Sequence, residues 1–471
     1  MKKPSKKLTH TILTQTPRYL AIITIALYIA AAISLFIANV IPVLYFIILA
    51  VLGGFGLFLV LKPLFSKKLT KKKGVVLSIV AVLISLICAG VVSFSISLLT
   101  FLTTIQTDEY STETYSIVAE KDRAMTTEKA KTAAMVRTDP YFEDAKAELK
   151  NHTKAAVSDC PTTVAAMTDL KKDTVDTTVL NAANLQLAKD TEEAFDTTFE
   201  VIKTFTIKVQ NTSKKAPVAD SSKPFALYIS GIDTYGNIST VSRSDVNMLV
   251  VANPKTHQML LVNTPRDYYV QLHGTTGTKD KLTHAGIYGI DMSRQTLADL
   301  YGVEIPYYVR VNFSSLMTIV DAVGGVDVYS DYAFKSFHEG YNHLNGKQAL
   351  EFSRERYSFT EGDRQRGRNQ QRVIEAIVAK MSTPGALVNY QAILNSVQSA
   401  VQTNVPPSFV TSLINKQVGS AKGWTTKSIS VDGTGATGPT YSMGAQPLYV
   451  MIPNQASLDT ARAAIKTEMQ Q

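Results

Sequence analysis

Four charged residues stand at the ends of three short apolar segments in the C-terminal half of the chain. Residues 225–232, 245–253 and 258–264 are rich in aliphatic and β-branched side chains, which is typical of strands. The short connection after the second segment contains Asn253-Pro254, which predicts that the second and third strands pair antiparallel. If the first two strands also pair antiparallel, all three ends meet at one sheet edge. That edge would carry Asp233, Arg243, Asp245 and Arg266.

Two carboxylates and two guanidinium groups at one edge predict a site for a phosphorylated ligand. Asp233 and Asp245 could hold a divalent metal, and such hard oxygen ligands favour Mg²⁺ or Mn²⁺. Arg243 and Arg266 could each bind two phosphate oxygens through the planar guanidinium fork. Simpler roles stay open, because Asp233 could form an Asx turn and Arg243 with Asp245 a surface ion pair.

A second charged cluster lies in residues 351–374, which contain six arginines and four acidic residues. Arg354 and Arg356 share a face of an extended chain. Asp363, Arg366 and Gln370 share a face of a helix. By itself the cluster could be a mixed-charge surface helix, but beside the first cluster its excess of arginine predicts an anion site. The six arginines are Arg354, Arg356, Arg364, Arg366, Arg368 and Arg372.

Both clusters belong to a region in which strand and helix patterns alternate. The class is therefore mixed α/β, with a sheet covered by helices on both faces. Before it, residues 108–210 are polar and predict a small α/β accessory domain, with helices in 121–150 and a strand at 199–209. Further expected strands are 305–313, 326–330 and 446–453, and expected helices are 293–302, 314–325, 346–352, 368–381 and 458–469.

The distribution of charge excludes a general nucleic-acid-binding surface, so no nucleic-acid partner is expected. The net charge is +9, but residues 1–107 contain eleven Lys and Arg and no acidic residue. The rest of the chain has 37 basic and 39 acidic residues. Two cysteines, Cys88 and Cys160, are too few for a disulfide framework or a cysteine-based metal site.

The N-terminal region predicts a membrane anchor with three transmembrane helices. The 43 residues from Tyr19 to Leu61 lack charge, about twice the length needed to cross a hydrocarbon core of ~30 Å. A third uncharged run follows at 74–105. Signal peptides have one shorter apolar stretch, and buried soluble helices rarely lack charge over such a length. The expected spans are about 19–38, 41–61 and 76–102.

Lysine and arginine cluster at 2–18 and 62–73, on both sides of the first two spans. Short basic loops stay in the cytoplasm, so the N-terminus is expected inside the cell and everything after about residue 105 outside. The expected organisation is a membrane anchor at 1–106, an extracellular accessory domain at 107–212 and an extracellular catalytic domain at 213–471 with its motif core at 224–400.

Seven ordered sequence blocks make the region from about 220 to 400 resemble the LytR–CpsA–Psr family of Gram-positive bacteria. The anchor and the extra domain are similar to the streptococcal capsule-linked branch of that family. The blocks are SGIDT (230–234), SRSDVNML (242–249), TPRDYYV (264–270), KDKLTHA (279–285), DAVGGVDV (321–328), LNGKQALEFSRER (344–356) and GDRQRGRNQQ (362–371).

The resemblance implies a membrane-bound phosphotransferase. It would move a polyprenyl-pyrophosphate-linked cell-wall glycopolymer, a capsular polysaccharide in this branch, onto peptidoglycan through a phosphodiester bond and release polyprenyl phosphate. It also implies Mg²⁺ (or Mn²⁺), an apolar tunnel for the lipid, and capsule-assembly membrane proteins as partners. The plasma membrane is its expected location.

The resemblance also implies roles for individual residues. Asp233 and Asp245 match the metal-associated carboxylates, and with Arg266 they would form the catalytic set. The pyrophosphate ligands would be Arg243, Arg266, Lys281, Arg354, Arg356, Arg366 and Gln370. One position departs from the family pattern, because many members have arginine where Asn369 stands, and Arg368 beside it could replace that arginine.

The sequence contains no recognisable Ser-His-Asp set or cysteine nucleophile, which favours direct in-line transfer over a covalent intermediate. Asp363 or a metal-bound carboxylate could orient the acceptor hydroxyl, and the residues leave both open. Two other functions need the same arginines. One is a non-catalytic regulator that binds polyprenyl pyrophosphate, and the other is a pyrophosphatase that uses water as acceptor.

Overall fold

The structure is a computed structural model of the 471-residue chain and forms two compact units. The first unit comprises Met1–Thr104 and Pro407–Lys422, and the second Ile105–Pro406 and Gly423–Gln471. The described residues are 6–66, 69–106, 110–192, 194–210, 216, 220–232, 238, 241–381, 394, 398, 400–420 and 422–470.

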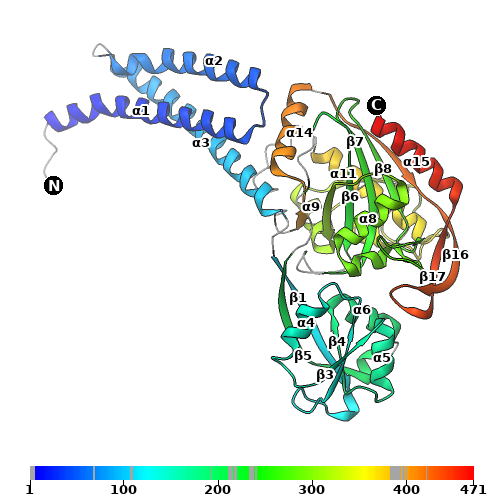
Figure 1. The fold of residues 1–471 in the computed structure, drawn as a ribbon. Coiled ribbons are helices and arrows are strands. Elements are labelled where there is room, and N and C mark those ends of the chain that lie inside the picture. Colours follow the sequence, from blue (N-terminus) through cyan, green and yellow to red (C-terminus); the bar gives the residue numbers. More distant parts are fainter. Residues whose placement is uncertain are drawn as a thin grey trace. The chain divides into compact units, whose positions relative to one another are not determined.

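Three long helices dominate the first unit (Figure 1). They are α1 (Lys6–Ala38), α2 (Val43–Leu61) and α3 (Lys71–Thr104), with the 3-10 turn η1 (Lys62–Phe65) between the last two. The segments Thr16–Ala38, Val43–Phe65 and Lys71–Thr104 are long and apolar enough to cross a membrane, and little of their surface is buried inside the protein. The three apolar helices predicted from the sequence are thus confirmed and are compatible with a membrane anchor.

The helix α14 (Pro407–Ser420) also belongs to this first unit, although the sequence assigns its residues to the C-terminal domain. Its Asn415 side chain donates a hydrogen bond to the carbonyl oxygen of Asn39, at 3.2 Å, in the turn between α1 and α2. The predicted domain boundaries near residues 106 and 212 stay predictions.

The accessory domain is a five-stranded mixed sheet with helices (Figure 1). Its strand order is β3-β2-β4-β1-β5, with β1 antiparallel to β4 and β5, and β2 parallel to β3 and β4. The strands are β1 (Tyr110–Glu120), β2 (Thr132–Val136), β3 (Ala156–Cys160), β4 (Thr177–Asn181) and β5 (Phe199–Gln210). The helices are η2 (Lys121–Arg123), α4 (Phe142–Leu149), α5 (Thr163–Lys171), α6 (Ala182–Thr191) and α7 (Phe195–Thr198).

This domain confirms the predicted strand at 199–209 but corrects the helical prediction for 121–150. Only α4 and a short 3-10 turn are helical there, and Thr132–Val136 forms the strand β2. Its alanines favour a helix locally, but β2 lies between two parallel neighbours with most of its side chains buried. Burial on both faces of the sheet outweighs that local preference.

The main domain contains a six-stranded mixed sheet in the order β14-β11-β6-β7-β8-β15. The strands are β6 (Phe225–Ile232), β7 (Ser244–Asn253), β8 (Gln258–Thr264), β11 (Tyr307–Asn312), β14 (Val401–Thr403) and β15 (Thr425–Ser430). The larger helices are α8 (Ile290–Tyr301), α9 (Phe313–Ala322), α10 (Gly346–Arg354), α11 (Asp363–Met381) and α15 (Gln455–Gln470). Smaller elements are β9 (Tyr269–Val270), β10 (Asp280–Lys281), η3 (Leu282–Tyr288), β12 (Val326–Ser330), β13 (Gly340–Leu344), β16 (Gly433–Thr440) and β17 (Gly444–Pro453).

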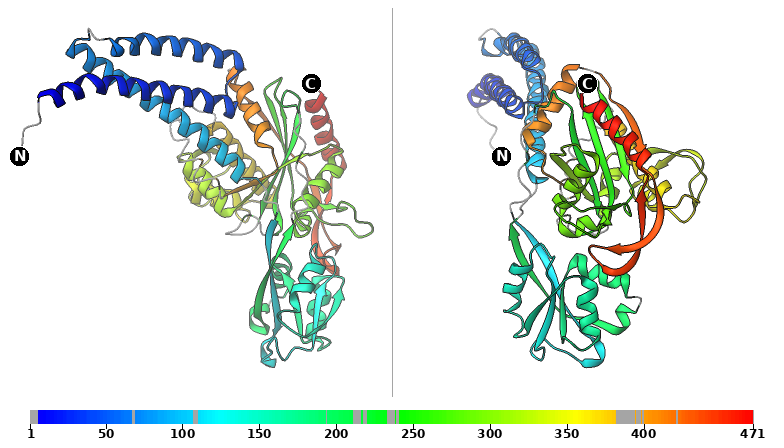
Figure 2. Two further views of the ribbon diagram at one scale, coloured as in Figure 1. Left: turned by 60° about the vertical axis from the view of Figure 1, so that its left-hand side comes forward. Right: turned by 45° about the vertical axis from the view of Figure 1, so that its right-hand side comes forward.

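Helices cover both faces of this sheet, as the pattern of its strands requires (Figure 2). In β7, Leu249 and Val251 belong to a buried cluster that includes residues of α8 and α15. Met248 and Val250 point to the other face, where Ile374 of α11 packs against them. Alternate residues of one strand therefore fill two cores, and the predicted mixed α/β fold class is confirmed.

Candidate active site

The ends of β6, β7 and β8 meet at one edge of the sheet. Both neighbouring pairs are antiparallel, with Ile232 opposite Ser244 and Asn247 opposite Thr264. Arg243 directly precedes β7, Asp245 is the second residue of β7, and Arg266 follows the end of β8. The structure therefore brings these three residues together as predicted. Asp233 lies outside the described residues.

A cavity of about 380 Å³ opens at this edge, and its lining combines two chemically different kinds of side chain. The polar part of the lining includes seven of the predicted ligands: Arg243, Asp245, Arg266, Arg354, Arg356, Arg366 and Gln370. The aliphatic part of the lining, called the aliphatic wall below, comprises Ile229, Ile232, Val246, Val311, Leu316, Leu350, Val373 and Ile374. A ligand with an anionic head and an apolar tail would match both parts.

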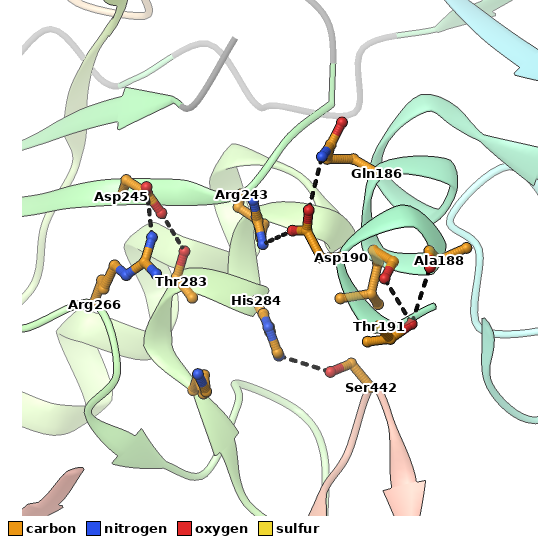
Figure 3. A network of polar contacts seen from close by, with 12 residues as sticks. Gln186, Ala188, Asp190, Thr191, Arg243, Asp245, Arg266, Thr283, His284 and Ser442 are labelled. Carbon is orange, nitrogen blue, oxygen red and sulfur yellow. Dashed lines mark hydrogen bonds and ion pairs between the residues drawn. The ribbon is translucent and has the colours of Figure 1, made fainter. Parts of the chain in front are cut away.

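Asp245 is a carboxylate of the polar lining that pairs with Arg266 (Figure 3). Arg266 donates to its Oδ2 at 2.7 Å, and the Thr283 hydroxyl donates to its Oδ1 at 2.9 Å. Burial raises the pKa of Asp245, but Arg266, then Arg366 and Arg243, outweigh burial and hold that pKa below its usual value. The side chain is therefore an ionised acceptor facing several cations.

The 3-10 element η3 fixes the loops that carry these two residues. The backbone amide of Thr283 donates to the Arg266 carbonyl at 2.8 Å, which ties η3 to the loop after β8. On its other side, Gly286 lies against the start of β7, where an added Cβ would meet the Ser242 carbonyl and stand 2.7 Å from the Ser244 amide. Only glycine allows this close approach.

Arg354 and Arg356 come from the end of α10 and the loop after it. Between them, Glu355 is buried, pairs with Lys335 at 2.5 Å and accepts the Ser358 amide at 2.9 Å. Burial raises the pKa of Glu355, but the Lys335 hydrogen bond and the backbone donors outweigh burial and lower it to about 2. These contacts hold Glu355 in place between two arginines that both line the cavity. Arg354 is helical rather than extended, which differs from the shared extended face predicted for the pair.

The six arginines of the second cluster divide into two groups. Arg354, Arg356 and Arg366 line the cavity. The other three pair with acids that do not line it, in the pairs Arg364–Asp432, Arg368–Glu361 and Arg372–Asp331. The three arginines that line the cavity are the three that were predicted as pyrophosphate ligands, and that role stays a prediction.

The structure shows what Asn369 does at the position where many family members have arginine. Its side chain is fully buried, accepts a hydrogen bond from Gln365 at 3.0 Å and donates to the Phe352 carbonyl at 3.3 Å, which joins α11 to α10. Arg368 is not among the residues that line the cavity, and its side chain donates to Gln365 at 2.8 Å, so its substitution for a family arginine stays a prediction. Gly367 next to it packs closely against the Asn263 side chain and so holds α11 against β8.

Lys281 is the predicted ligand that the structure places elsewhere. Its ammonium group binds the Asp267 carboxylate at 2.8 Å and is not part of the cavity lining. Lys281 therefore neutralises the carboxylate of Asp267, the residue directly after Arg266. Asp363 begins α11, but its side chain lies outside the described residues.

Two residues at the site were not predicted. Thr283 lies in the KDKLTHA block, and its hydroxyl could have been noticed there. Asp190 of α6 lines the cavity from the accessory domain, and no sequence pattern pointed to it.

A buried Asp280–His284–Ser442 cluster also qualifies the expectation that no Ser-His-Asp set occurs. Both Asp280 Oδ1 and Ser442 Oγ meet the same ring nitrogen, His284 Nδ1, at 2.7 and 2.8 Å. Figure 3 shows the contact between His284 and Ser442. A relay would need the two partners on different nitrogens. None of the three residues lines the cavity, so this cluster joins loops rather than activating a nucleophile.

Comparisons with known proteins show what the chain is similar to. Residues 180–458 match the LytR_cpsA_psr family. The chain is 40% identical over 189 residues to a Bacillus cereus protein named polyisoprenyl-teichoic acid–peptidoglycan teichoic acid transferase TagU, over 39% of this chain and 61% of that protein. It is 34% identical over 224 residues to an Enterococcus faecalis protein of the same name, over 46% and 71% of the two chains.

The chain thus spans less than two thirds of the length of the Bacillus cereus relative. Among solved structures, Bacillus subtilis TagV is 28% identical with a TM-score of 0.45, and the match covers 53% of this chain and 98% of that one. The family match covers more than half of the chain and includes every described element that builds the polar part of the cavity in the main domain. The chain therefore belongs to the LytR_cpsA_psr family.

Proposed function

We propose that the protein transfers a polyprenyl-pyrophosphate-linked glycopolymer to peptidoglycan. The observation that carries this proposal is the cavity itself, whose lining combines five arginines with eight aliphatic side chains. Arginine forks suit the pyrophosphate, and the aliphatic wall suits the start of the polyprenyl chain. The relatives named as teichoic acid–peptidoglycan transferases support the same reaction class.

In the proposed reaction, an acceptor hydroxyl of peptidoglycan attacks the phosphorus that is bonded to the glycopolymer. A new phosphorus–oxygen bond forms to the acceptor, and the bond from that phosphorus to the bridging oxygen breaks. Polyprenyl phosphate leaves with the bridging oxygen, and the acceptor proton passes to a base. The products are a phosphodiester-linked conjugate and polyprenyl phosphate.

The cavity arginines would act mainly by position and charge. Negative charge grows on the leaving phosphate during the transfer, and fixed guanidinium groups in a partly closed site stabilise such charge strongly. Arg266 is held by Asp245 and the loop after β8, so its fork needs little reorganisation during the reaction. The aliphatic wall would keep water away from the lipid side of the phosphate.

We propose that a divalent metal binds at this cavity. Asp245 is an ionised hard oxygen donor, and Mg²⁺ is commonly held by one or two carboxylates together with substrate phosphates and water. The described part of the chain has no cluster of three or more metal-ligating side chains. Asp245 would therefore hold Mg²⁺ together with the phosphates and with Asp233, as proposed from the family resemblance. When bound, the ion would neutralise charge on the pyrophosphate.

We further propose that the main and accessory domains face the cell exterior, where peptidoglycan lies, and that the glycopolymer is a capsular polysaccharide. The basic segments at 2–18 and 62–73 support the orientation through the positive-inside rule. The polymer assignment rests on the resemblance of the anchor and accessory domain to the capsule-linked branch. Capsule-assembly membrane proteins are proposed partners on the same ground.

The full-length protein in detergent, given a synthetic polyprenyl-pyrophosphate oligosaccharide, tests the reaction. We expect release of polyprenyl phosphate that depends on added peptidoglycan glycan strands. Equal release without acceptor would indicate a pyrophosphatase. Binding without any release would indicate a regulator. Comparing the release of polyprenyl phosphate from donors with capsular and with teichoic repeat units would test the polymer assignment.

A further inference from the structure

The accessory domain contributes a side chain to the catalytic cavity. Asp190, near the end of α6, accepts a hydrogen bond from Arg243 Nη1 at its Oδ2, at 2.6 Å. Its other oxygen, Oδ1, accepts from Gln186 one turn earlier on the same helix, at 2.9 Å. Figure 3 shows the carboxylate between these two donors. Both oxygens are therefore oriented before any ligand arrives.

Apolar packing holds α6 in this place. Ala183 and Leu187 of α6 form a buried cluster with Val241, Ile287 and Met443 of the main domain. Val241 stands two residues before Arg243, and Ile287 belongs to η3, the element that positions the start of β7. The contact thus joins α6 to the same loops that build the site. Asp190 is placed by this interface, not by a flexible surface segment.

We propose that Asp190 is a positioning residue that holds Arg243 in the orientation needed to bind the pyrophosphate. This inference rests on the proposed function. A guanidinium group has five N–H donors in a planar fork, so an arginine can bind a carboxylate and a phosphate oxygen together. The accessory domain is then part of the active site.

The effect should act on affinity for the pyrophosphate. An arginine side chain that is already fixed loses less conformational entropy when the ligand binds. Arg243 has 16% of its side chain exposed, and the Asp190 contact limits its remaining freedom. If the Asp190 carboxylate only competed with the phosphate for Arg243, it would weaken pyrophosphate binding. Removing this carboxylate would then strengthen pyrophosphate binding.

Binding of geranylgeranyl pyrophosphate to the full-length protein in detergent micelles, measured by calorimetry, tests the inference. This probe has the two chemical parts that the cavity offers and needs no turnover. For Asp190→Ala we expect a dissociation constant about tenfold higher, and Asp190→Glu should recover part of the loss. Glu192→Ala is the matched control, because Glu192 follows the same helix but pairs with Lys171 and does not line the cavity.

A double-mutant cycle with Arg243→Ala separates positioning from a general structural effect. If Asp190 acts through Arg243, the double variant should bind no more weakly than Arg243→Ala alone. Independent, additive losses, or Asp190→Ala binding as tightly as the unchanged protein or more tightly, would overturn the inference while leaving the proposed function intact. Failure of the unchanged protein to bind the probe would overturn the proposed function itself, and the inference with it.

Discussion

At the residue scale, the partner of each arginine decides whether it can serve the cavity. Spacing predicted which arginines share a face, but it could not show that Asp432, Glu361 and Asp331 would neutralise half of the second cluster. Those acids come from distant segments or from the loop before α11. The predicted placement of Arg243, Asp245 and Arg266 at one sheet edge agrees with the structure, because strand ends follow directly from the strand pattern. Asp190 could not be predicted, because it reaches the site only through domain packing.

Replacing Arg266 by lysine separates fork geometry from charge. Lysine keeps the positive charge but cannot bind Asp245 and a phosphate oxygen with one planar group. Losing a charge-assisted pair in a partly closed site costs roughly 2–5 kcal/mol, which is at least about thirtyfold in rate. Release of polyprenyl phosphate measures the effect. Arg368→Lys, outside the cavity, should keep nearly full activity, and near-normal release by Arg266→Lys would disprove the assigned role.

Replacing Asp245 by asparagine tests the central carboxylate. The amide keeps the shape but removes the negative charge that pairs with Arg266 and would hold Mg²⁺. We expect transfer to fall by about a hundredfold or more, which corresponds to roughly 2.7 kcal/mol. Chelation with EDTA should have a similar effect on the unchanged protein. Asp331→Asn, whose partner Arg372 lies outside the cavity, is the control, and full transfer in EDTA would rule out the metal.

At the element scale, the close contact between η3 and the start of β7 determines where the backbone beside Arg243 lies. Gly286→Ala would push a methyl group into the backbone at Ser242–Ser244, next to Arg243. Overpacking of this kind costs roughly 1–3 kcal/mol. We expect a lower melting temperature and weaker donor binding together. Gly438→Ala, where an added Cβ meets nothing within 4 Å, should change neither, and unaltered binding by Gly286→Ala would show that the contact does not position the site.

The contact between β1 and the main sheet contains a buried acid that predicts a pH dependence. Glu113 is 2% exposed, and burial raises its pKa to about 7 although Arg310 and the Val241 backbone act to lower it. Asp139 nearby also raises this pKa. Between the usual 4.5 and about 7, the folded state holds a proton that the unfolded chain releases. The contribution of this protonation to the free energy of unfolding is therefore complete below pH 4.5 and is lost as the pH rises through 7.

The loss corresponds to a few kcal/mol, on the order of 3. The melting temperature of the full-length protein in detergent should be higher near pH 5 than near pH 8, and Glu113→Gln should reduce that difference. Glu143→Gln, at an exposed position of α4, should leave the difference unchanged. A Glu113→Gln variant with the same pH dependence as the unchanged protein would contradict this role for Glu113.

The elements themselves were largely predictable. The strands at 225–232 and 326–330 match β6 and β12 residue for residue, because alternation and turn residues mark them locally. The strand β2 was missed because its alanines gave a helical signal that packing between two parallel strands overrides. The grouping of α14 with the apolar helices depends on tertiary contacts such as Asn415 with Asn39, which no local pattern encodes.

At the scale of the whole molecule, the proposed function requires the main domain to lie outside the cell. The basic segments around the first two spans predict this orientation. Protease added to intact, wall-stripped cells should digest the chain beyond about residue 105. A cytoplasmic marker protein in the same cells should stay intact. Protection of the whole C-terminal part would contradict the orientation and the use of peptidoglycan as acceptor.

The fate of one phosphorus atom tests the central proposal most directly. A donor labelled with ³²P in the phosphate attached to the oligosaccharide is incubated with the full-length protein and peptidoglycan glycan strands. In-line transfer predicts that the label appears in the phosphodiester that joins oligosaccharide and peptidoglycan, with one unlabelled polyprenyl phosphate released per conjugate. Label that ends in free oligosaccharide phosphate, or that stays in the donor, would contradict the proposal.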